Sequence, residues 1–221
     1  MDTSIDTARF NMIQQQIRPW NVGDDGVLSV MADIPREPFV PAAYRNLAYA
    51  DMEIPIAEGR TMLAPKVVAH MLQALAIRPD DKILQIGTGT GYVTACLSQL
   101  GGHVVAMEIH ADLAEQTQTA LQALKQRQPE VRVGDGLAGP VDGHPFDVIA
   151  VTGSLPDAAA LEILEAQLAP GGRLFAVVGE EPVMEALIVT RITDRDYRRQ
   201  SLLETSVPAL EKAPEPELFV F

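Results

Sequence analysis

Apolar positions follow a helical spacing near the N-terminus and form short, strand-like runs further along the chain. Residues 3–17 show a loose helical stripe, which should end before Pro19 because the residue before a proline is pushed out of helical geometry. A second short helix is expected next, capped by Asp24 or Asp25. Four prolines between residues 35 and 55 then predict an ordered but irregular segment.

After residue 63, strand-like runs alternate with helical stripes. Pro65 suits the first position of a helix, and the apolar stripe of that helix continues to Leu75. Such alternation builds a parallel sheet with helices on both faces and right-handed crossovers. The expected strands are 82–86, 103–108, 130–133, 146–151 and 173–178, and the expected later helices are 91–100, 111–126 and one that begins near residue 156.

The C-terminal part has a different pattern. Segments 184–192, 199–207 and 217–221 look extended and have no helical stripes between them, so we expect antiparallel strands at one edge of the sheet. The whole pattern predicts an α/β fold, doubly wound around a mostly parallel seven-stranded sheet. Antiparallel C-terminal edge strands and a helical N-terminal extension complete it.

One predicted strand ends in three alternate glycines, Gly87, Gly89 and Gly91. A strand that enters a helix through such a turn lets the backbone approach a ligand where any Cβ would collide. Glu108 lies 108 − 87 = 21 residues beyond the first glycine, the spacing at which an acidic side chain reaches a ribose diol. A dinucleotide fingerprint would need a glycine where this chain has Tyr92. The turn is therefore typical of S-adenosylmethionine binding.

Ligands of such sheets bind beyond the carboxyl ends of the strands, where the strand order reverses. Asp135 follows the third strand and is placed to accept a hydrogen bond from an adenine amine, although G-D-G is also a good turn sequence. Glu108 has the alternative of being a solvated strand end. Gln85 stands where many such enzymes carry an acid, so an amide or a water must do that work here.

Composition excludes several classes of function. The 221-residue chain has a formal net charge of −13, from 30 acidic and 17 basic residues, which disfavours a nucleic acid substrate. Cys96 is the lone cysteine, which fits a reducing cytoplasm, and its apolar setting favours a packed helix residue over a nucleophile. We see no signal sequence, no apolar run of the roughly 20 residues that a membrane span needs, and no metal-ligand spacing among the histidines. A soluble cytoplasmic protein without a metal is expected.

Several motifs together make the chain resemble the protein-L-isoaspartate O-methyltransferases, which transfer a methyl group from S-adenosylmethionine to a carboxylate. The resemblance covers most of residues 9–180, and the R-E-x-F-V-P and A-Y-x-D elements lie outside the general methyltransferase signature. The matching segments are MIQQQIR at 12–18, IPRE at 34–37, FVP at 39–41, AYAD at 48–51, IPI at 54–56, GRT at 59–61, IGTGTGY at 86–92, GDG at 134–136 and GG at 171–172.

The resemblance implies a Rossmann-like methyltransferase core at 64–221, with S-adenosyl-L-methionine as cofactor and a protein, peptide or small-molecule acceptor. Residues 1–63 either cover one face of the sheet or close over the cofactor as a lid that includes loop 59–63. The implied cofactor-binding residues are Thr61, Met62, Leu63, Gly87, Thr88, Gly89, Gly91, Tyr92, Glu108, Ile109, Asp135, Gly136 and Thr152, and the implied substrate-facing residues are Asp51, Gly153 and Ser154.

The chain departs from the family pattern at three places. Leu63 occupies the position of a family serine beside the methyl-transfer site, so no catalytic side chain is assigned. Gly153 and Ser154 replace two alanines after the fourth strand, and the C-terminal end also differs. The resemblance implies a methyltransferase that methylates a carboxylate on a damaged protein or a related acceptor. Because Leu63 replaces the family serine, we also expect poor or absent activity on isoaspartyl peptides. The alternatives are another acceptor, a cofactor-binding scaffold without catalysis, and a nicotinamide-dependent oxidoreductase, against which Tyr92 argues.

Overall fold

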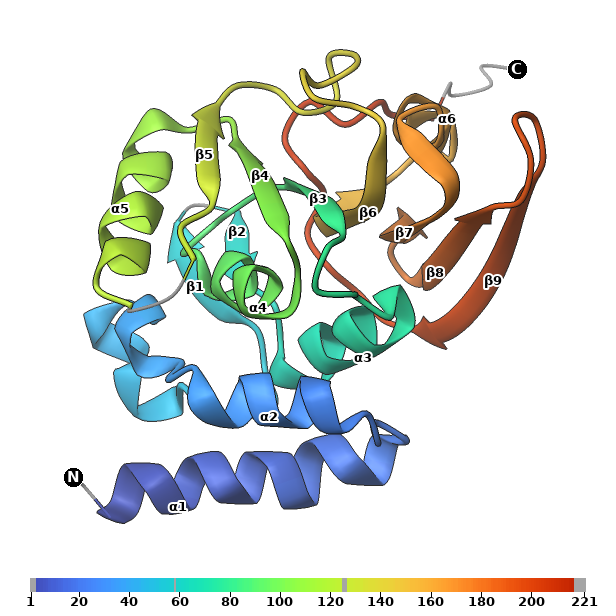
Figure 1. Cartoon of the computed structure of the whole chain (residues 1–221). Coiled ribbons are helices and arrows are strands. Elements are labelled where there is room, and N and C mark those ends of the chain that lie inside the picture. The colour runs from blue at the N-terminus through green and yellow to red at the C-terminus, as the bar shows by residue number, and fades with distance from the viewer. Residues whose placement is uncertain (1–2, 58, 125–126, 217–221) are drawn as a thin grey trace.

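A mixed β-sheet forms the centre of the computed structural model, which describes residues 3–57, 59–124 and 127–216 (Figure 1). Within these residues the sheet has seven strands in the order β5-β4-β3-β6-β7-β8-β9. The expected α/β fold with a seven-stranded sheet is confirmed. The strands are β3 (Lys82–Ile86), β4 (His103–Glu108), β5 (Glu130–Val133), β6 (Phe146–Leu155), β7 (Leu168–Glu180), β8 (Val183–Arg191) and β9 (Tyr197–Glu204).

The parallel part of the sheet places the order reversal at β3. This strand pairs in parallel with β4 on one side and with β6 on the other, while β5 continues outward from β4. Residues 83–86 of β3 are all buried, because helices cover both faces of the sheet. The ends of β3, β4 and β6 therefore meet at the switch point where ligands of such sheets bind.

Different helices cover the two faces of the sheet, and each face has its own hydrophobic cluster. On one face, α3 (Pro65–Leu75), α4 (Tyr92–Leu100) and α5 (Ala111–Gln122) contribute side chains to one large hydrophobic cluster. On the other face, α6 (Ala159–Glu165) packs into a second cluster. Each helix thus buries its apolar stripe against β-branched and aromatic residues of the sheet.

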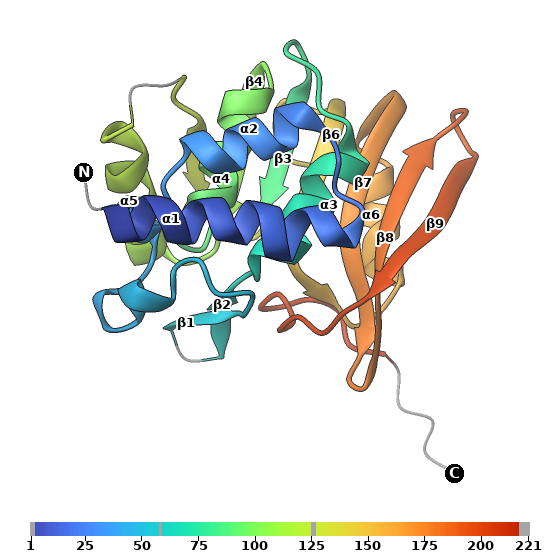
Figure 2. The same cartoon turned by 90° about the horizontal axis from the view of Figure 1, so that it is seen from below.

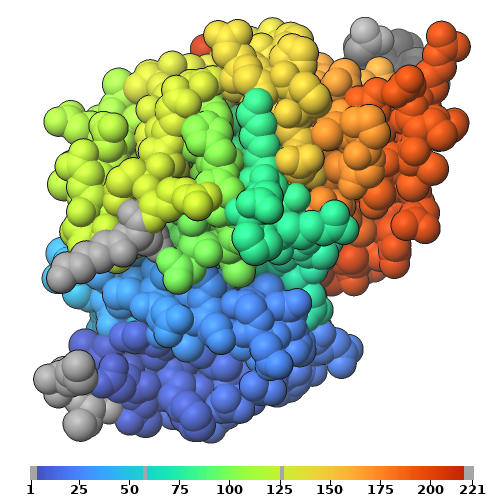
Figure 3. Space-filling view, viewed as in Figure 1, coloured from blue at the N-terminus to red at the C-terminus, as the bar shows by residue number. Residues whose placement is uncertain are grey.

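The N-terminal region forms a further layer over α3 and α4. Helix α1 (Thr3–Asn11) continues into a π-helical segment, Met12–Ile17, and α2 (Asp25–Asp33) lies across α3 and α4 (Figure 2). In the space-filling view this region is a continuous layer against the core (Figure 3). Its buried residues belong to the same hydrophobic cluster as those of α3 and α4. The division of the chain at residue 63 stays a prediction.

Of the two candidate caps for α2, Asp24 is the one used. Its Oδ1 accepts a hydrogen bond from the backbone N–H of Val27 at 2.9 Å, which satisfies one of the free donors of the first helical turn.

The C-terminal strands differ from the expectation in length. Strand β6 continues to Leu155, and β7 begins at Leu168 rather than at residue 173. The register of β7 against β6 shifts between Leu168 and Arg173, where Gly171 takes a left-handed φ of 76°. Strand β8 is antiparallel to β7 and β9 is antiparallel to β8, as expected, but β9 ends at Glu204. The third expected segment, 217–221, lies outside the described residues.

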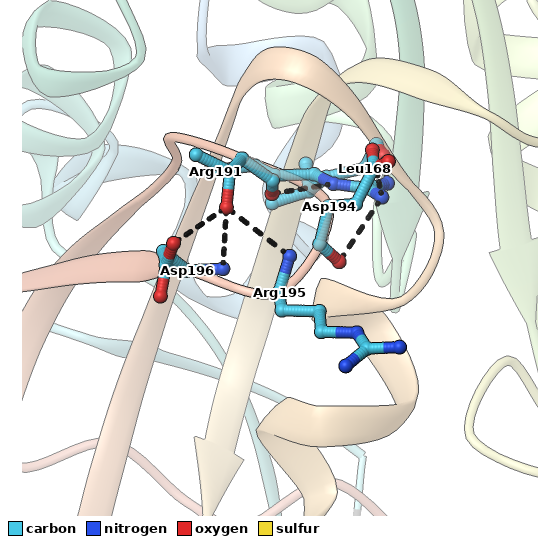
Figure 4. Close-up of polar contacts among 6 residues, drawn as sticks. Leu168, Arg191, Asp194, Arg195 and Asp196 are labelled. Carbon is cyan, nitrogen blue, oxygen red and sulfur yellow. Dashed lines mark hydrogen bonds and ion pairs between the residues drawn. The ribbon is translucent and has the colours of Figure 1, made fainter.

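The turn between β8 and β9 is closed by the side chain of Arg191 (Figure 4). Its guanidinium donates to the backbone carbonyl of Leu168 and, at 3.3 Å, to that of Thr193. The Thr193 hydroxyl in turn accepts from the backbone N–H groups of Arg195 and Asp196. Long edge strands are thereby connected by a turn whose polar groups are satisfied internally.

The pair Glu165–Arg199 provides a test of how the edge strands are attached. Glu165 is 3% exposed on α6, and its two carboxylate oxygens accept from Arg199 of β9, each at 2.8 Å. We predict that Glu165→Gln lowers the free energy of unfolding by about 1–2 kcal/mol, because one of two charge-assisted bonds is lost. Urea denaturation measures this change. Glu162→Gln, three residues earlier and exposed, is the control, and equal values for the two variants would contradict the prediction.

Candidate cofactor and methyl-transfer site

A cavity of about 300 Å³ opens at the carboxyl ends of β3, β4 and β6. Its walls also include the hairpin of β1 (Ile54–Ala57) and β2 (Arg60–Met62), and a segment near the C-terminus. This volume lies at the lower end of the range for small-molecule sites. The cavity thus occupies the position at which the strand order predicts a ligand.

The glycine turn after β3 forms one wall of the cavity with main chain alone. Gly87 and Gly89 have left-handed φ values of 83° and 53°. A Cβ on Gly87 would lie 2.9 Å from the Thr152 hydroxyl, and one on Gly89 would lie 3.3 Å from Ile56. The turn therefore needs glycine for its conformation and for the space that a close ligand occupies.

Glu108 holds this turn in place. The side chain is 5% exposed, and its Oε2 accepts three hydrogen bonds at 3.0 Å, from the N–H and hydroxyl of Thr88 and from the N–H of Gly89. Its Oε1 accepts from the N–H of His110 at 3.2 Å. The alternative of a solvated strand end is thus wrong. Glu108 also lines the cavity, and its ribose-binding role stays a prediction.

Asp135 makes the expected turn, and its adenine-binding role stays a prediction. Its Oδ1 accepts from the N–H of Leu137 at 2.9 Å, which makes the expected turn. The residue also lines the cavity, and Oδ2 makes no hydrogen bond within the part of the chain that the structure describes. One oxygen shapes the loop while the other is left for a donor such as an exocyclic amine.

Two segments from distant parts of the chain close the cavity. The C-terminal strap, Val207–Glu211, runs beside the end of β6, where Leu210 donates its N–H to the carbonyl of Ser154 at 2.9 Å. The Glu211 carboxylate lies 2.7 Å from Nε2 of His110 and 3.6 Å from the guanidinium of Arg60. These polar contacts connect the strap to the β1–β2 hairpin and to the loop after β4.

A second, smaller cavity of about 30 Å³ lies on the inner side of the hairpin. Thr61, Gly89 and Thr152 line both cavities, so the two adjoin. Leu63 lines the smaller one and is 4% exposed. Arg36, which is fully buried, lies beside it and donates to the Leu63 carbonyl at 2.5 Å.

Burial also sets the protonation of groups near the smaller cavity. Burial raises the pKa of the Cys96 thiol to about 12, so the thiol stays protonated. The expectation of a packed cysteine is confirmed, since Cys96 is 0% exposed on α4. Burial likewise raises the pKa of Glu53, which accepts from the Thr61 hydroxyl at 2.7 Å.

Most of the predicted site residues come together around the two cavities. Gly91 lies outside them as the N-cap of α4, and Asp51 pairs with Lys66 at 3.3 Å. Ser154 is fully buried within β6 rather than in a loop after it. The large cavity is lined by Thr61, Gly87, Gly89, Glu108, Ile109, Asp135, Gly136, Thr152 and Gly153, and the small one adds Met62, Leu63, Thr88 and Tyr92.

The sequence patterns missed the C-terminal strap and Arg36 as cavity residues, included Arg60 only as part of loop 59–63, and assigned no binding role to His110. The strap carries no motif, and its position depends on where β9 ends. His110 could have been found, because it follows Glu108 at the carboxyl end of β4. The described residues contain no cluster of three possible metal ligands and no helix long and apolar enough to cross a membrane.

The fold and the cavity together define a class I S-adenosylmethionine-dependent methyltransferase. A glycine turn without a third dinucleotide glycine, a buried acid at the end of the second strand and an aspartate after the third fit the sugar and base of that cofactor. Gly87, Gly89, Glu108 and Asp135 are the residues that would hold it.

Comparisons with known proteins identify the family. The model of the protein-L-isoaspartate(D-aspartate) O-methyltransferase family matches residues 8–211. A protein-L-isoaspartate O-methyltransferase from Koribacter versatilis is 45% identical over 188 residues, which are 85% of this chain and 82% of that protein. Protein-L-isoaspartate O-methyltransferase 1 from Rhodopseudomonas palustris is 38% identical over 222 residues, 97% of this chain and 90% of that protein.

A solved structure supports the fold. A Plasmodium falciparum protein assigned to the isoaspartate O-methyltransferases, crystallised with S-adenosyl-L-homocysteine, superposes with a TM-score of 0.76 at 19% identity and covers 94% of this chain and 98% of its own. This chain therefore belongs to the protein-L-isoaspartate(D-aspartate) O-methyltransferase family. The expected family and its cofactor, S-adenosyl-L-methionine, are confirmed. The alternative of a nicotinamide-dependent oxidoreductase is wrong.

The network around Glu108 leads to a prediction about cofactor affinity. We expect Glu108→Ala to weaken S-adenosylhomocysteine binding by about 1–3 kcal/mol, because hydrogen bonds to a charged group are lost. Calorimetry measures the change, and Glu115→Ala on the exposed side of α5 is the control. If Glu108 contacts the ribose directly, the loss is smaller for an analogue without the 2′-hydroxyl. Unchanged affinity of the Glu108 variant would contradict the prediction.

Proposed function

We propose that this chain methylates the free carboxylate of isoaspartyl residues in damaged peptides and proteins. The observation that carries the proposal is the extent of the family match, because residues 8–211 include every described residue that lines the two cavities. The relatives at 45% and 38% identity are named as isoaspartate O-methyltransferases, and this chain matches most of the length of each.

Methyl transfer to a carboxylate depends mainly on alignment. The sulfonium of S-adenosylmethionine supplies a methyl group that is already electrophilic, and an ionised carboxylate needs no general base. The chain's part is to hold the reacting groups in line and to exclude water, which can supply most of the acceleration. The glycine turn, the β1–β2 hairpin and the C-terminal strap are placed for these tasks around the large cavity. No side chain is assigned as an acid or base.

Leu63 is the feature that distinguishes this site from the family pattern. Its side chain is buried against the small cavity, next to Thr61 and Met62 of β2. An aliphatic side chain excludes water but cannot orient an attacking oxygen by a hydrogen bond. This position favours a second candidate function, in which the same cofactor serves an acceptor less polar than an isoaspartyl peptide.

The setting that we propose is the cytoplasm, with a protein or peptide acceptor rather than a nucleic acid. The net charge of −13 opposes binding to phosphate backbones. The lone cysteine is buried and reduced, as in proteins of reducing compartments.

The assay that tests the proposal is transfer of a tritiated methyl group from S-adenosylmethionine to an isoaspartyl peptide. The same peptide with a normal aspartyl linkage is the matched control. The proposal predicts labelling of the isoaspartyl peptide alone, with a base-labile methyl ester as product. Labelling of a cell extract without labelling of the peptide would support the second candidate and overturn the first.

Leu63→Ser tests the role of the missing hydroxyl. We predict that this variant raises isoaspartyl turnover, by up to roughly 10²–10³-fold if one positioned hydrogen bond forms in the transition state. The neighbouring Met62→Ser variant is the control, because it adds a hydroxyl one position earlier in the chain. Rates of methyl transfer at saturating cofactor provide the measurement. Unchanged turnover in Leu63→Ser, or native activity equal to that of a serine-containing relative, would show that this position does not limit the reaction.

A further inference from the structure

Arg36 is a buried charged residue to which the proposed methyl transfer assigns no role. It follows α2 and precedes a short 3-10 turn, Glu37–Phe39, and its residue exposure is 0%. One terminal nitrogen donates to the carbonyl of Leu63, and the guanidinium lies 4.9 Å from the ring centroid of Tyr92. The other two nitrogens, Nε and Nη1, have no hydrogen-bond partner among the described residues.

This guanidinium is also without a carboxylate partner. Within the described ranges no acidic side chain forms an ion pair with Arg36, and Asp51, whose charge acts on it, pairs with Lys66 at 3.3 Å. Burial lowers the pKa of Arg36, but an arginine still stays charged at neutral pH. An unpaired buried charge is costly, so its retention calls for an anionic partner.

Arg36 lines the small cavity. Of the side chains described there, Arg36 alone carries a charge. The hydroxyls of Thr61, Thr88 and Thr152 already donate elsewhere, to Glu53, to Glu108 and to the backbone of β3 and its turn. A small anionic group that enters from the large cavity would therefore meet Arg36 as its charged donor.

We propose that Arg36 forms a carboxylate-binding subsite at the inner end of the cofactor cavity. The inference rests on the proposed function, and the carboxylate comes either from the acceptor or from the amino acid end of the cofactor. Charge-assisted bonds from a desolvated guanidinium fit this chemistry. If the acceptor supplies the carboxylate, Arg36 acts as a positioning residue beside Leu63 and provides the donor that leucine cannot.

Arg36→Met is the informative variant. Methionine keeps an unbranched apolar chain against Tyr92 but removes the charge and the N–H groups. Arg45→Met, on an exposed residue of the same N-terminal region, is the control, and Arg36→Lys tests rescue by a retained charge. Thermal unfolding shows whether each variant is folded.

Calorimetry separates the two sources without requiring turnover. If the cofactor supplies the carboxylate, Arg36→Met lowers the affinity for S-adenosylhomocysteine about 10- to 100-fold and leaves unchanged that for its decarboxylated analogue, S-adenosyl-3-thiopropylamine. If the acceptor supplies it, cofactor affinity is kept. Binding of an isoaspartyl peptide to the S-adenosylhomocysteine complex then falls by the same factor, whereas binding of the peptide methyl ester does not. In both cases Arg36→Lys recovers part of the loss.

A folded Arg36→Met protein that binds both carboxylate ligands within twofold of the native protein would overturn the proposal. If that variant does not fold, the NMR resonance of the Arg36 Nε–H group in the native protein provides the test. It should shift with the carboxylate-bearing ligand but not with its decarboxylated or esterified counterpart, and no selective shift would again overturn the proposal. If the native protein binds these ligands but does not methylate isoaspartyl peptides, the proposed function is wrong and the carboxylate subsite is not contradicted.

Discussion

The carboxylate of Glu108 is the interaction on which the architecture of the site depends. It lies at the end of β4, yet three of its four hydrogen bonds come from the glycine turn that follows β3. A carboxylate that is 5% exposed would be costly without such donors, and the turn, in left-handed conformations at Gly87 and Gly89, would lack an anchor without the carboxylate. Each therefore stabilises the other. The consequence is a wall of main chain at the point where the strand order reverses.

The cavity in front of this wall is closed by the β1–β2 hairpin and by the C-terminal strap. Glu211 of the C-terminal strap contacts Arg60 of the β1–β2 hairpin and His110 of the loop after β4. These contacts are half-exposed, so each contributes little on its own. A closure of this kind can open at small cost, as a site that exchanges cofactor and product must do, while the buried Glu108 network stays in place.

The sequence was most informative where a local pattern dictates structure. Alternating strands and helices, the Asp24 cap and the glycine turn could all be predicted, because each depends on residues within a few positions of one another. The sequence did not reveal the C-terminal strap, whose place beside Ser154 depends on the length of β9 and on a pairing across more than 50 residues. Arg36 was visible only as part of a family motif. Its burial, with no ion pair to another described residue, follows from packing between α2, β2 and α4, which no periodicity encodes.

The charge of the chain makes short-range recognition necessary for a carboxylate substrate. A protein with a net charge of −13 repels an anionic acceptor at long range, although salt limits that repulsion to about 8 Å at physiological ionic strength. Surface charges therefore cannot guide or select the acceptor. A desolvated positive group at the inner end of the cavity can do so, because electrostatic attraction is strongest where water is excluded. Arg36 is such a group, and it lies against the backbone of Leu63. Arg36 thus places a charged donor beside the residue at which the family pattern has a neutral one.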